Sequence, residues 1–158
     1  MLHNKQLGFT LIEVIMVIIM LGIVSITALP KFFQKNTFAE RAFFADTLNA
    51  LRYAQKLAVA TGCKVKVSFS SDSYSLTRKG DTSSTLCPPS GSIYSLAVPH
   101  PSSGANSYSG SESGITLTAS VSSIIFNPLG TASTDATLIV GGVRTIKVIA
   151  KTGFVYGS

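Results

Sequence analysis

One carboxylate stands alone in the longest apolar run of the chain. Residues Phe9 to Leu29 contain a single charged side chain, that of Glu13. As a helix, these 21 or so residues would be roughly 31 Å long, which matches the hydrocarbon core of a bilayer. A carboxylate in a membrane costs about 2.5–3.5 kcal/mol at the bilayer centre and less towards the surface. We therefore expect Glu13 to meet a partner charge, so the chemistry of this segment is ion pairing.

Two cysteines, Cys63 and Cys87, lie beyond the apolar run. In a domain outside the cytoplasm, a disulfide between them is the default expectation. Closing a loop of about 25 residues stabilises a fold by roughly 3 kcal/mol in the chain-entropy description. A zinc site is the weaker alternative, because two cysteines and the isolated His100 do not make a ligand set. We expect no metal and no cofactor.

Basic residues recur on two predicted strands. Lys64 and Lys66 share a face of one strand, and Arg144 and Lys147 lie on another. A solvated outer face of a sheet explains them most simply. The alternative is a patch of these four side chains that follows the phosphates of DNA. The sequence does not bring the two pairs together, so DNA is not the expected partner.

The sequence does not contain the usual catalytic patterns. It has no GxxxxGK[ST] phosphate loop and no GxSxG nucleophile elbow. His100 lies between two prolines, where it is poorly placed to serve as a general base. The acidic residues of the second half of the chain all fall near predicted turns, where solvated side chains are expected: Asp72, Asp81, Glu112 and Asp135. The sequence therefore indicates a protein that is not an enzyme.

The composition suits one domain outside the cytoplasm in addition to the apolar run. The chain has 158 residues, a formal net charge of +6, and only 13% charged residues. Serine, threonine and glycine are abundant. Loss of residues 1–8 would remove Lys5 and no acid, which leaves a net charge of +5. This balance favours anionic partners only as a general tendency.

Two helical segments are predicted before the cysteines. The first is a transmembrane helix over residues 9–30, which Pro30 should kink or loosen. The second is an amphipathic helix over residues 31–62, with a capping box at Thr37–Glu40 and a C-terminal cap at Gly62. Its polar side is predicted to carry Asp46, Asn49, Tyr53 and Lys56. Its apolar stripe is predicted to face a sheet and consists of Phe44, Leu48, Leu51, Ala54 and Ala58.

Residues 63–158 alternate between apolar and polar side chains and contain many turn residues. The predicted strands cover residues 63–70, 74–79, 93–98, 115–121, 123–126, 137–140, 143–149 and 154–156. Residues 102–114 are expected to form an exposed loop, Asn127–Gly130 a turn, and Gly141-Gly142 a two-residue hairpin turn. These elements predict an α+β fold, in which a long N-terminal helix packs with its second half on an antiparallel sheet.

The residues Gly8-Phe9-Thr10-Leu11-Ile12-Glu13, between a short basic leader and the apolar run, resemble the class III leader of type IV pilins and type II secretion pseudopilins. A secretory signal peptide has a shorter apolar region, followed by a cleavage site of small residues. A generic membrane anchor would not need Gly8 and Glu13 at this spacing. The resemblance implies cleavage between Gly8 and Phe9 by a prepilin peptidase, and N-methylation of Phe9. It also implies that Glu13 sets the assembly register by pairing with the N-terminal amine of a neighbouring subunit.

The resemblance also implies how the chain is organised. Residues 1–8 are the leader, residues 9–30 the transmembrane helix, residues 31–62 the amphipathic helix, and residues 63–158 a periplasmic or extracellular β-rich domain. The protein would first sit in the bacterial inner membrane with a single span, and then in a pilus at the cell surface.

Beyond the leader, the chain resembles the GspH/FimT-like class through the helix Leu51–Ala58 and the turn Phe126–Gly130. Residues Phe43–Ala58, followed by Gly62-Cys63, most resemble the C-type minor pilin of the mannose-sensitive haemagglutinin (MSHA) pilus. This implies a minor pilin that helps to initiate or cap a pilus. Its partners would be other pilin subunits, the prepilin peptidase and methyltransferase, the assembly platform and the inner membrane. Two alternatives are an H-type pseudopilin of the type II secretion system and a FimT-like pilin that binds DNA.

Overall fold

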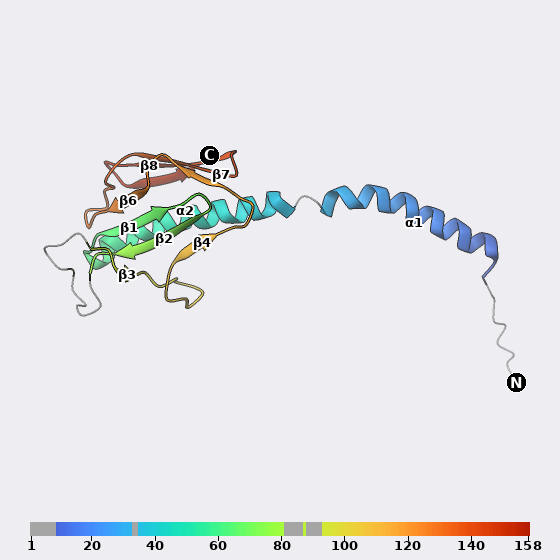
Figure 1. The fold of residues 1–158 in the computed structure, drawn as a ribbon, viewed down its shortest axis with the longest axis horizontal. Helices are drawn as coiled ribbons and strands as arrows, with labels where there is room; N and C mark the ends of the chain where they lie inside the picture. The colour runs from blue at the N-terminus through green and yellow to red at the C-terminus, as the bar shows by residue number, and fades with distance from the viewer. Residues whose placement is uncertain (1–8, 33–34, 81–86, 88–92) are drawn as a thin grey trace, which may run out of the picture. The chain divides into compact units, whose positions relative to one another are not determined.

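The structure, a computed structural model, describes residues 9–32, 35–80, 87 and 93–158. The chain forms two compact units, residues 1–35 and 36–158. The first unit contains α1 (Leu11–Phe32), which continues through Pro30, so this proline does not end the helix (Figure 1). Of the helices in the part of the chain that the structure describes, none is long and apolar enough to cross a membrane.

The second unit begins with α2 (Lys35–Thr61). Thr37 therefore lies inside the first turn, and the prediction that it caps the helix is wrong. The carboxylate of Glu40 does not complete a capping box but forms an ion pair with Arg144. At the other end, Gly62 has a φ of +67°, in the left-handed region that favours glycine, which confirms its predicted place after the helix.

The buried stripe of α2 differs in part from the predicted one. Phe44 and Leu48 are only half-buried, while the other three predicted residues are fully buried: Leu51, Ala54 and Ala58. Phe43, Thr47 and Ala50 are buried as well. Thr47 satisfies its hydroxyl by donating to the Phe43 carbonyl at 2.7 Å. Threonine and alanine carry little apolar surface, so a search for hydrophobic periodicity gives them too little weight.

The first sheet has the strand order β3-β2-β1-β6, and β4 pairs with β2 (Figure 1). Its strands are β1 (Val65–Phe69), β2 (Ser73–Arg78), β3 (Leu96–Ala97), β4 (Ser109–Ser111) and β6 (Ser123–Phe126). All of these pairs are antiparallel. Alternate side chains point into the core, which confirms the predicted period: Val65, Val67, Tyr74, Leu76, Ile124 and Phe126.

The second sheet has the order β5-β7-β8-β9. Its antiparallel strands are β5 (Leu117–Ala119), β7 (Ala136–Val140), β8 (Arg144–Ile149) and β9 (Phe154–Gly157). The predicted α+β class is confirmed, but the strands form two sheets rather than one. The division arises between β6, which pairs with β1, and β7, which pairs with β5 and β8. Alternation within a strand predicts which face is buried, but it does not predict the partner strand.

Two turns have the predicted residues. The Gly130 amide donates to the Asn127 carbonyl at 2.8 Å, which closes the predicted turn. Gly141 and Gly142 have φ values of +62° and +77°. Because Val140 pairs with Arg144, the hairpin loop contains three residues, one more than predicted.

Residues 93–114 differ from the prediction in two ways. The expected strand over residues 93–98 shortens to the two residues of β3. The expected loop over residues 102–114 contains β4 and the buried Tyr108, which is only 3% exposed. The Tyr108 ring lies 5.5 Å from the Tyr53 ring and 6.2 Å from the Tyr74 ring, measured between centroids. This aromatic anchor explains why a serine- and glycine-rich segment returns to the sheet.

Side chains of α2 also bind main-chain carbonyls near its C-terminal end. Arg52 Nε donates to the carbonyl of Val155 in β9 at 3.2 Å. Gln55 Nε2 donates to the carbonyls of Gly130 and Thr152, at 2.9 Å and 3.0 Å. A disulfide joins Cys63, directly after the helix cap, to Cys87, with 5.4 Å between their Cα atoms. The predicted cysteine pairing is thus confirmed.

Candidate functional site

The first candidate site is the start of α1. The Glu13 amide donates to the Thr10 carbonyl at 3.0 Å, and Thr10 Oγ1 lies 3.4 Å from the same nitrogen. Thr10 is therefore the N-cap, and Glu13 is the third residue of the helix. This is the S/T-x-x-E spacing of a capping box, a signal that is present in the sequence but was not among the predicted features. The cap fixes where the helix begins, and so fixes the position of Glu13.

Glu13 lies in an apolar setting. A shallow hollow of about 250 Å³ is lined by Phe9, Glu13, Val14, Val17 and Ile18. Phe9 is 81% exposed, and the large apolar side chains of α1 from Leu11 to Val24 are exposed as well. An acidic side chain in the first turn interacts favourably with the helix dipole. The site can thus present one carboxylate beside Phe9 in otherwise apolar surroundings. Gly8, the other predicted site residue here, lies outside the described residues.

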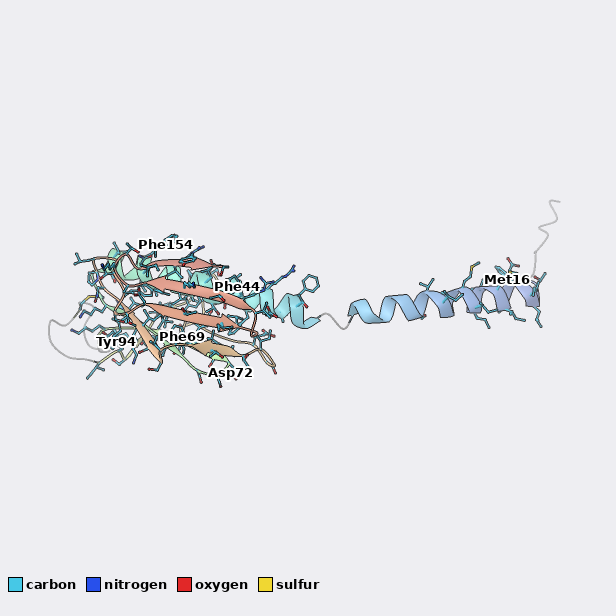
Figure 2. The ribbon with its side chains drawn as sticks, turned by 90° about the horizontal axis from the view of Figure 1, so that it is seen from above. Met16, Phe44, Phe69, Asp72, Tyr94 and Phe154 are labelled. Atoms are coloured by element: carbon cyan, nitrogen blue, oxygen red, sulfur yellow. A yellow bond between two sulfur atoms is a disulfide. The ribbon has the colours of Figure 1, made fainter. Side chains whose placement is uncertain are left out.

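The second candidate site, the basic patch, is not assembled. Lys66 lies in β1 of the first sheet, with its Nζ 5.8 Å from the centroid of the Tyr94 ring, and Lys64 directly precedes this strand. Arg144 and Lys147 belong to β8 in the second sheet. Figure 2 shows Tyr94 along one side of this unit and Phe154, next to β8, along the other.

Arg144 and Lys147 also point to opposite faces of β8. Residues an odd number apart on a strand face opposite sides of a sheet. Arg144 shares its face with the buried Ile146 and Val148, whereas Lys147 is exposed. The Arg144 Nε lies 3.0 Å from Glu40 Oε1, although its N–H does not point at that oxygen well enough for a hydrogen bond. Arg144 therefore serves to hold α2, and its charge is already compensated.

A third group of polar residues surrounds Tyr74. The buried Tyr74 hydroxyl donates to Asp46 of α2. Burial, and then the bond to the Asp46 carboxylate, raise the pKa of Tyr74 far above its ordinary value. Burial also raises the pKa of Tyr108, with a smaller contribution from the charge of Asp46. Asp46 was predicted on the solvent side of the helix, because hydropathy gives no signal for a carboxylate that is held by a buried phenol.

These polar groups do not form a catalytic centre. His100 Nδ1 accepts the Ser103 amide at 3.1 Å, and its ring packs on Tyr108 with 4.3 Å between centroids. The histidine thus shapes the segment before β4. No group of three histidine, cysteine, aspartate or glutamate side chains among the described residues could hold a metal ion.

The hollow on the outer side of the first sheet is lined mainly by serines. Its volume is about 300 Å³, and its lining includes Ser68, Ser73, Ser75, Ser109 and Ser111. Ser109, Ser75, Ser68 and Ser123 lie directly opposite one another across β4, β2, β1 and β6. No charged or metal-binding side chain lines this hollow, so it offers no catalytic group.

Two known families match parts of this chain. The family described as "Type II transport protein GspH" matches residues 45–152. The chain belongs to the GspH family. The family described as "Prokaryotic N-terminal methylation motif" matches residues 3–29 of this GspH-family chain. No curated protein gave a significant match.

Two solved structures are similar to the chain at low sequence identity. The type IV minor pilin FimU of Pseudomonas aeruginosa is 14% identical, with a TM-score of 0.46 over 77% of this chain and 91% of that chain. The minor pseudopilin EpsH from the type 2 secretion system of Vibrio cholerae is 10% identical, with a TM-score of 0.49 over 77% of this chain and 94% of that chain.

GspH-family membership and the methylation motif together have three consequences. The chain is a minor pilin or pseudopilin of the GspH type, a structural subunit and not an enzyme. It carries the class III prepilin leader expected from its sequence. The family and the motif also imply a membrane-anchored component that is processed by a prepilin peptidase and assembles with other subunits of its kind.

Proposed function

We propose that this GspH-family chain is a minor pilin of the MSHA type, which helps to initiate or cap a surface pilus. The observation that carries the proposal is the start of α1. An exposed apolar helix begins there at a fixed residue and carries one carboxylate, Glu13, in its first turn. The resemblance of residues 43–58 and of Gly62-Cys63 to the MSHA C-type pilin supports this member of the family.

Processing would leave this arrangement intact. The cap uses Thr10 and not a residue of the leader, so cleavage between Gly8 and Phe9 leaves both contacts between Thr10 and the Glu13 amide in place. The new N-terminus, Phe9, would directly precede the N-cap. N-methylation would keep its amine positively charged and so preserve its ability to attract a carboxylate.

Glu13 would then set the register between neighbouring helices in the fibre. A carboxylate among apolar side chains is costly unless an opposite charge comes close, and an ion pair is strong in a low dielectric. The N-terminal amine of a neighbouring subunit would supply that charge only when the helices are in one alignment. A subunit docked out of register would leave Glu13 unpaired.

Residues 9–30 would hold the subunit in the inner membrane until assembly, with the β-rich domain on the periplasmic side. The assembly platform would then move the helix from the lipid into the fibre. The apolar side chains exposed on all sides of residues 11–24 are suited to both environments.

The runner-up is an H-type pseudopilin of the type II secretion system, and the description of the matched family favours it. A FimT-like DNA-binding pilin ranks third. Its four proposed contacts, Lys64, Lys66, Arg144 and Lys147, are divided between two sheets, and one of them already pairs with Glu40.

Intact mass and N-terminal sequencing of the protein from membranes and from sheared surface fibres would test the proposal. We expect a chain that starts at N-methylated Phe9 in the sheared fraction. The same processed chain confined to membranes would favour the pseudopilin. A chain that still starts at Met1 in a peptidase-competent cell would overturn both.

A further inference from the structure

The exposed face of α2 carries basic side chains and no acidic ones. Residues spaced to fall on one side of the helix are exposed, and we call them the basic face of α2: Arg41, Ala45, Asn49, Arg52 and Lys56. They lie opposite the buried stripe that contains Ala50 and Ala54. From Arg41 to Lys56 the face extends for about 22 Å along the helix axis.

The charges on this face are not neutralised within the described part of the chain. The structure records no ion pair or hydrogen bond for the Arg41 and Lys56 side chains there, and Arg52 donates to an uncharged carbonyl. Between the cations lie the small side chains of Ala45 and Asn49, which leave room for another surface to approach. Like charges spaced along one helix face repel each other and so favour an acidic partner.

A second copy of this chain is poorly suited to be that partner. Residues 36–158 contain ten basic but only six acidic side chains. Three of the six are already engaged: Glu40 with Arg144, Asp46 with Tyr74, and Asp135 with the Ala150 amide. Asp72 and Glu112 flank the paired residues Ser73 and Ser111, so they lie together at one end of β2 and β4. Asp81 lies outside the described residues. Among the described residues, the remaining carboxylates are therefore two at one end of a strand pair and do not form a row that could match a basic face about 22 Å long.

We infer that the basic face of α2 docks onto an acidic surface of a different pilin-type subunit. The inference rests on the proposed function, since it names the kind of partner that the subunit meets in a fibre. Charge complementarity selects a partner of the opposite sign and disfavours self-association through this face. Such a preference suits a subunit that occupies a defined place among other chains.

Site-specific photo-cross-linking of the full chain in its own host tests this inference. A photoreactive amino acid replaces Asn49, at the middle of the basic face. Three proteins with the photoreactive residue are compared. The first has no other change, the second carries Arg41→Glu and Lys56→Glu, and the third, the control, carries Lys64→Glu and Lys147→Glu. Both pairs change the net charge equally. The Arg41 and Lys56 side chains make no recorded polar contact within the described residues, so the fold should survive, and the thermal unfolding midpoint of each variant verifies this.

The expected product is an adduct with another pilin-type chain that has aspartate or glutamate at the cross-linked segment. Its yield should fall about tenfold in the Arg41 and Lys56 pair but not in the control pair. Changing the partner's acidic residues at the cross-linked segment to lysine should restore the yield with the variant that carries Arg41→Glu and Lys56→Glu. An adduct only with a second copy of this chain, with lipid or with nucleic acid would overturn the inference. An unchanged yield after reversal of the charges at Arg41 and Lys56 would also overturn it.

The N-terminal mass of the same samples separates this inference from the proposed function. A processed chain in fibres without the acidic adduct would refute the docking face and leave the pilin function standing. An acidic adduct on a chain that still begins at Met1 would support the docking face and refute the function in assembly.

Discussion

The guanidinium of Arg144 lies against the carboxylate of Glu40, with 3.0 Å between Nε and Oε1, and joins the start of β8 to α2. The same guanidinium lies over the Phe44 ring, 5.7 Å from its centroid. The turn before β8 approaches closely as well, because a Cβ on Gly141 would lie only 2.6 Å from Glu40 Cγ. The ion pair, the ring and the glycine together form one contact between the helix and the β7–β8 hairpin.

Loss of this contact should weaken the fold modestly. Replacement of Arg144 by alanine removes a partly exposed ion pair and a cation–π contact, so we expect a loss of about 1 kcal/mol in the free energy of unfolding. Denaturant titration of the detergent-solubilised chain measures it. A double-mutant cycle with Glu40→Ala should give a coupling that shrinks at high salt, and a coupling of zero would contradict this account.

Tyr74 should make the fold sensitive to alkaline pH. Its pKa is raised in the folded state by burial and by Asp46, so above its ordinary pKa of about 10 the folded chain holds a proton that the unfolded chain releases. The contribution of Tyr74 is therefore fully present below about pH 10 and is lost as the pH rises, by up to about 1.4 kcal/mol per pH unit.

The variant Tyr74→Phe isolates this effect. It should lose about 1 kcal/mol at neutral pH, because the hydrogen bond to Asp46 is gone, and it should have a shallower alkaline slope than the parent protein. Tyr94 and Tyr108, whose pKa values are also raised by burial, would account for the slope that remains. Equal slopes for the two proteins would show that Tyr74 ionises at its ordinary pKa.

The disulfide should contribute much of the stability of the second unit. Replacing Cys63 and Cys87 by serine opens a loop with a sequence separation of 24 residues, which should cost roughly 3 kcal/mol in the chain-entropy description. The denaturation midpoint of the double variant, compared with that of the oxidised and the reduced parent, measures the loss. A thiol assay on unfolded, unreduced protein should detect no free thiol, and detection of two would mean that the pair does not form in the cell.

Glu13 should matter for assembly and not for processing. Glu13→Ala removes the carboxylate but keeps Gly8, Phe9 and the N-cap Thr10, so cleavage and membrane insertion should remain near normal. Incorporation into sheared fibres should fall at least about tenfold, which immunoblotting of fibre and membrane fractions would measure. Glu13→Asp, which keeps the charge on a shorter side chain, is the matched control and should retain more incorporation. Normal incorporation of Glu13→Ala would refute the proposal that Glu13 sets the register during assembly.

Local sequence signals predicted most of the elements and few of the contacts between distant residues. Alternation at Val65 and Val67 and the glycine at position 62 depend on neighbouring residues, so strands and caps could be read directly. The division into two sheets and the pairing of β4 with β2 depend on distant residues, and periodicity does not encode them. Tyr108 illustrates the limit, since one aromatic residue in a serine-rich stretch outweighed the composition around it.

The functional residues also divide into those marked by a local sequence pattern and those that depend on contacts between distant residues. The leader motif is a contiguous pattern and was recognised from sequence alone. The basic patch combined residues far apart in the chain, and the structure separates them because β1 and β8 belong to different sheets. Arg144 in addition pairs with Glu40. The exposed cations of α2 were passed over because charged side chains on a helix surface are common. Their significance depends on knowing which acidic side chains are already engaged.

The hydrogen bonds from Arg52 and Gln55 to the carbonyls of Val155, Gly130 and Thr152 have a mechanical consequence. They fasten the C-terminal half of α2 to main-chain atoms of the second sheet and its adjoining turns, while Glu40 and Arg144 fasten its N-terminal half. Tension applied along the axis of α2 would load these hydrogen bonds and the ion pair together, in shear, and would not break them one after another. The helix would then transmit a pull to both ends of the domain before any single strand separates.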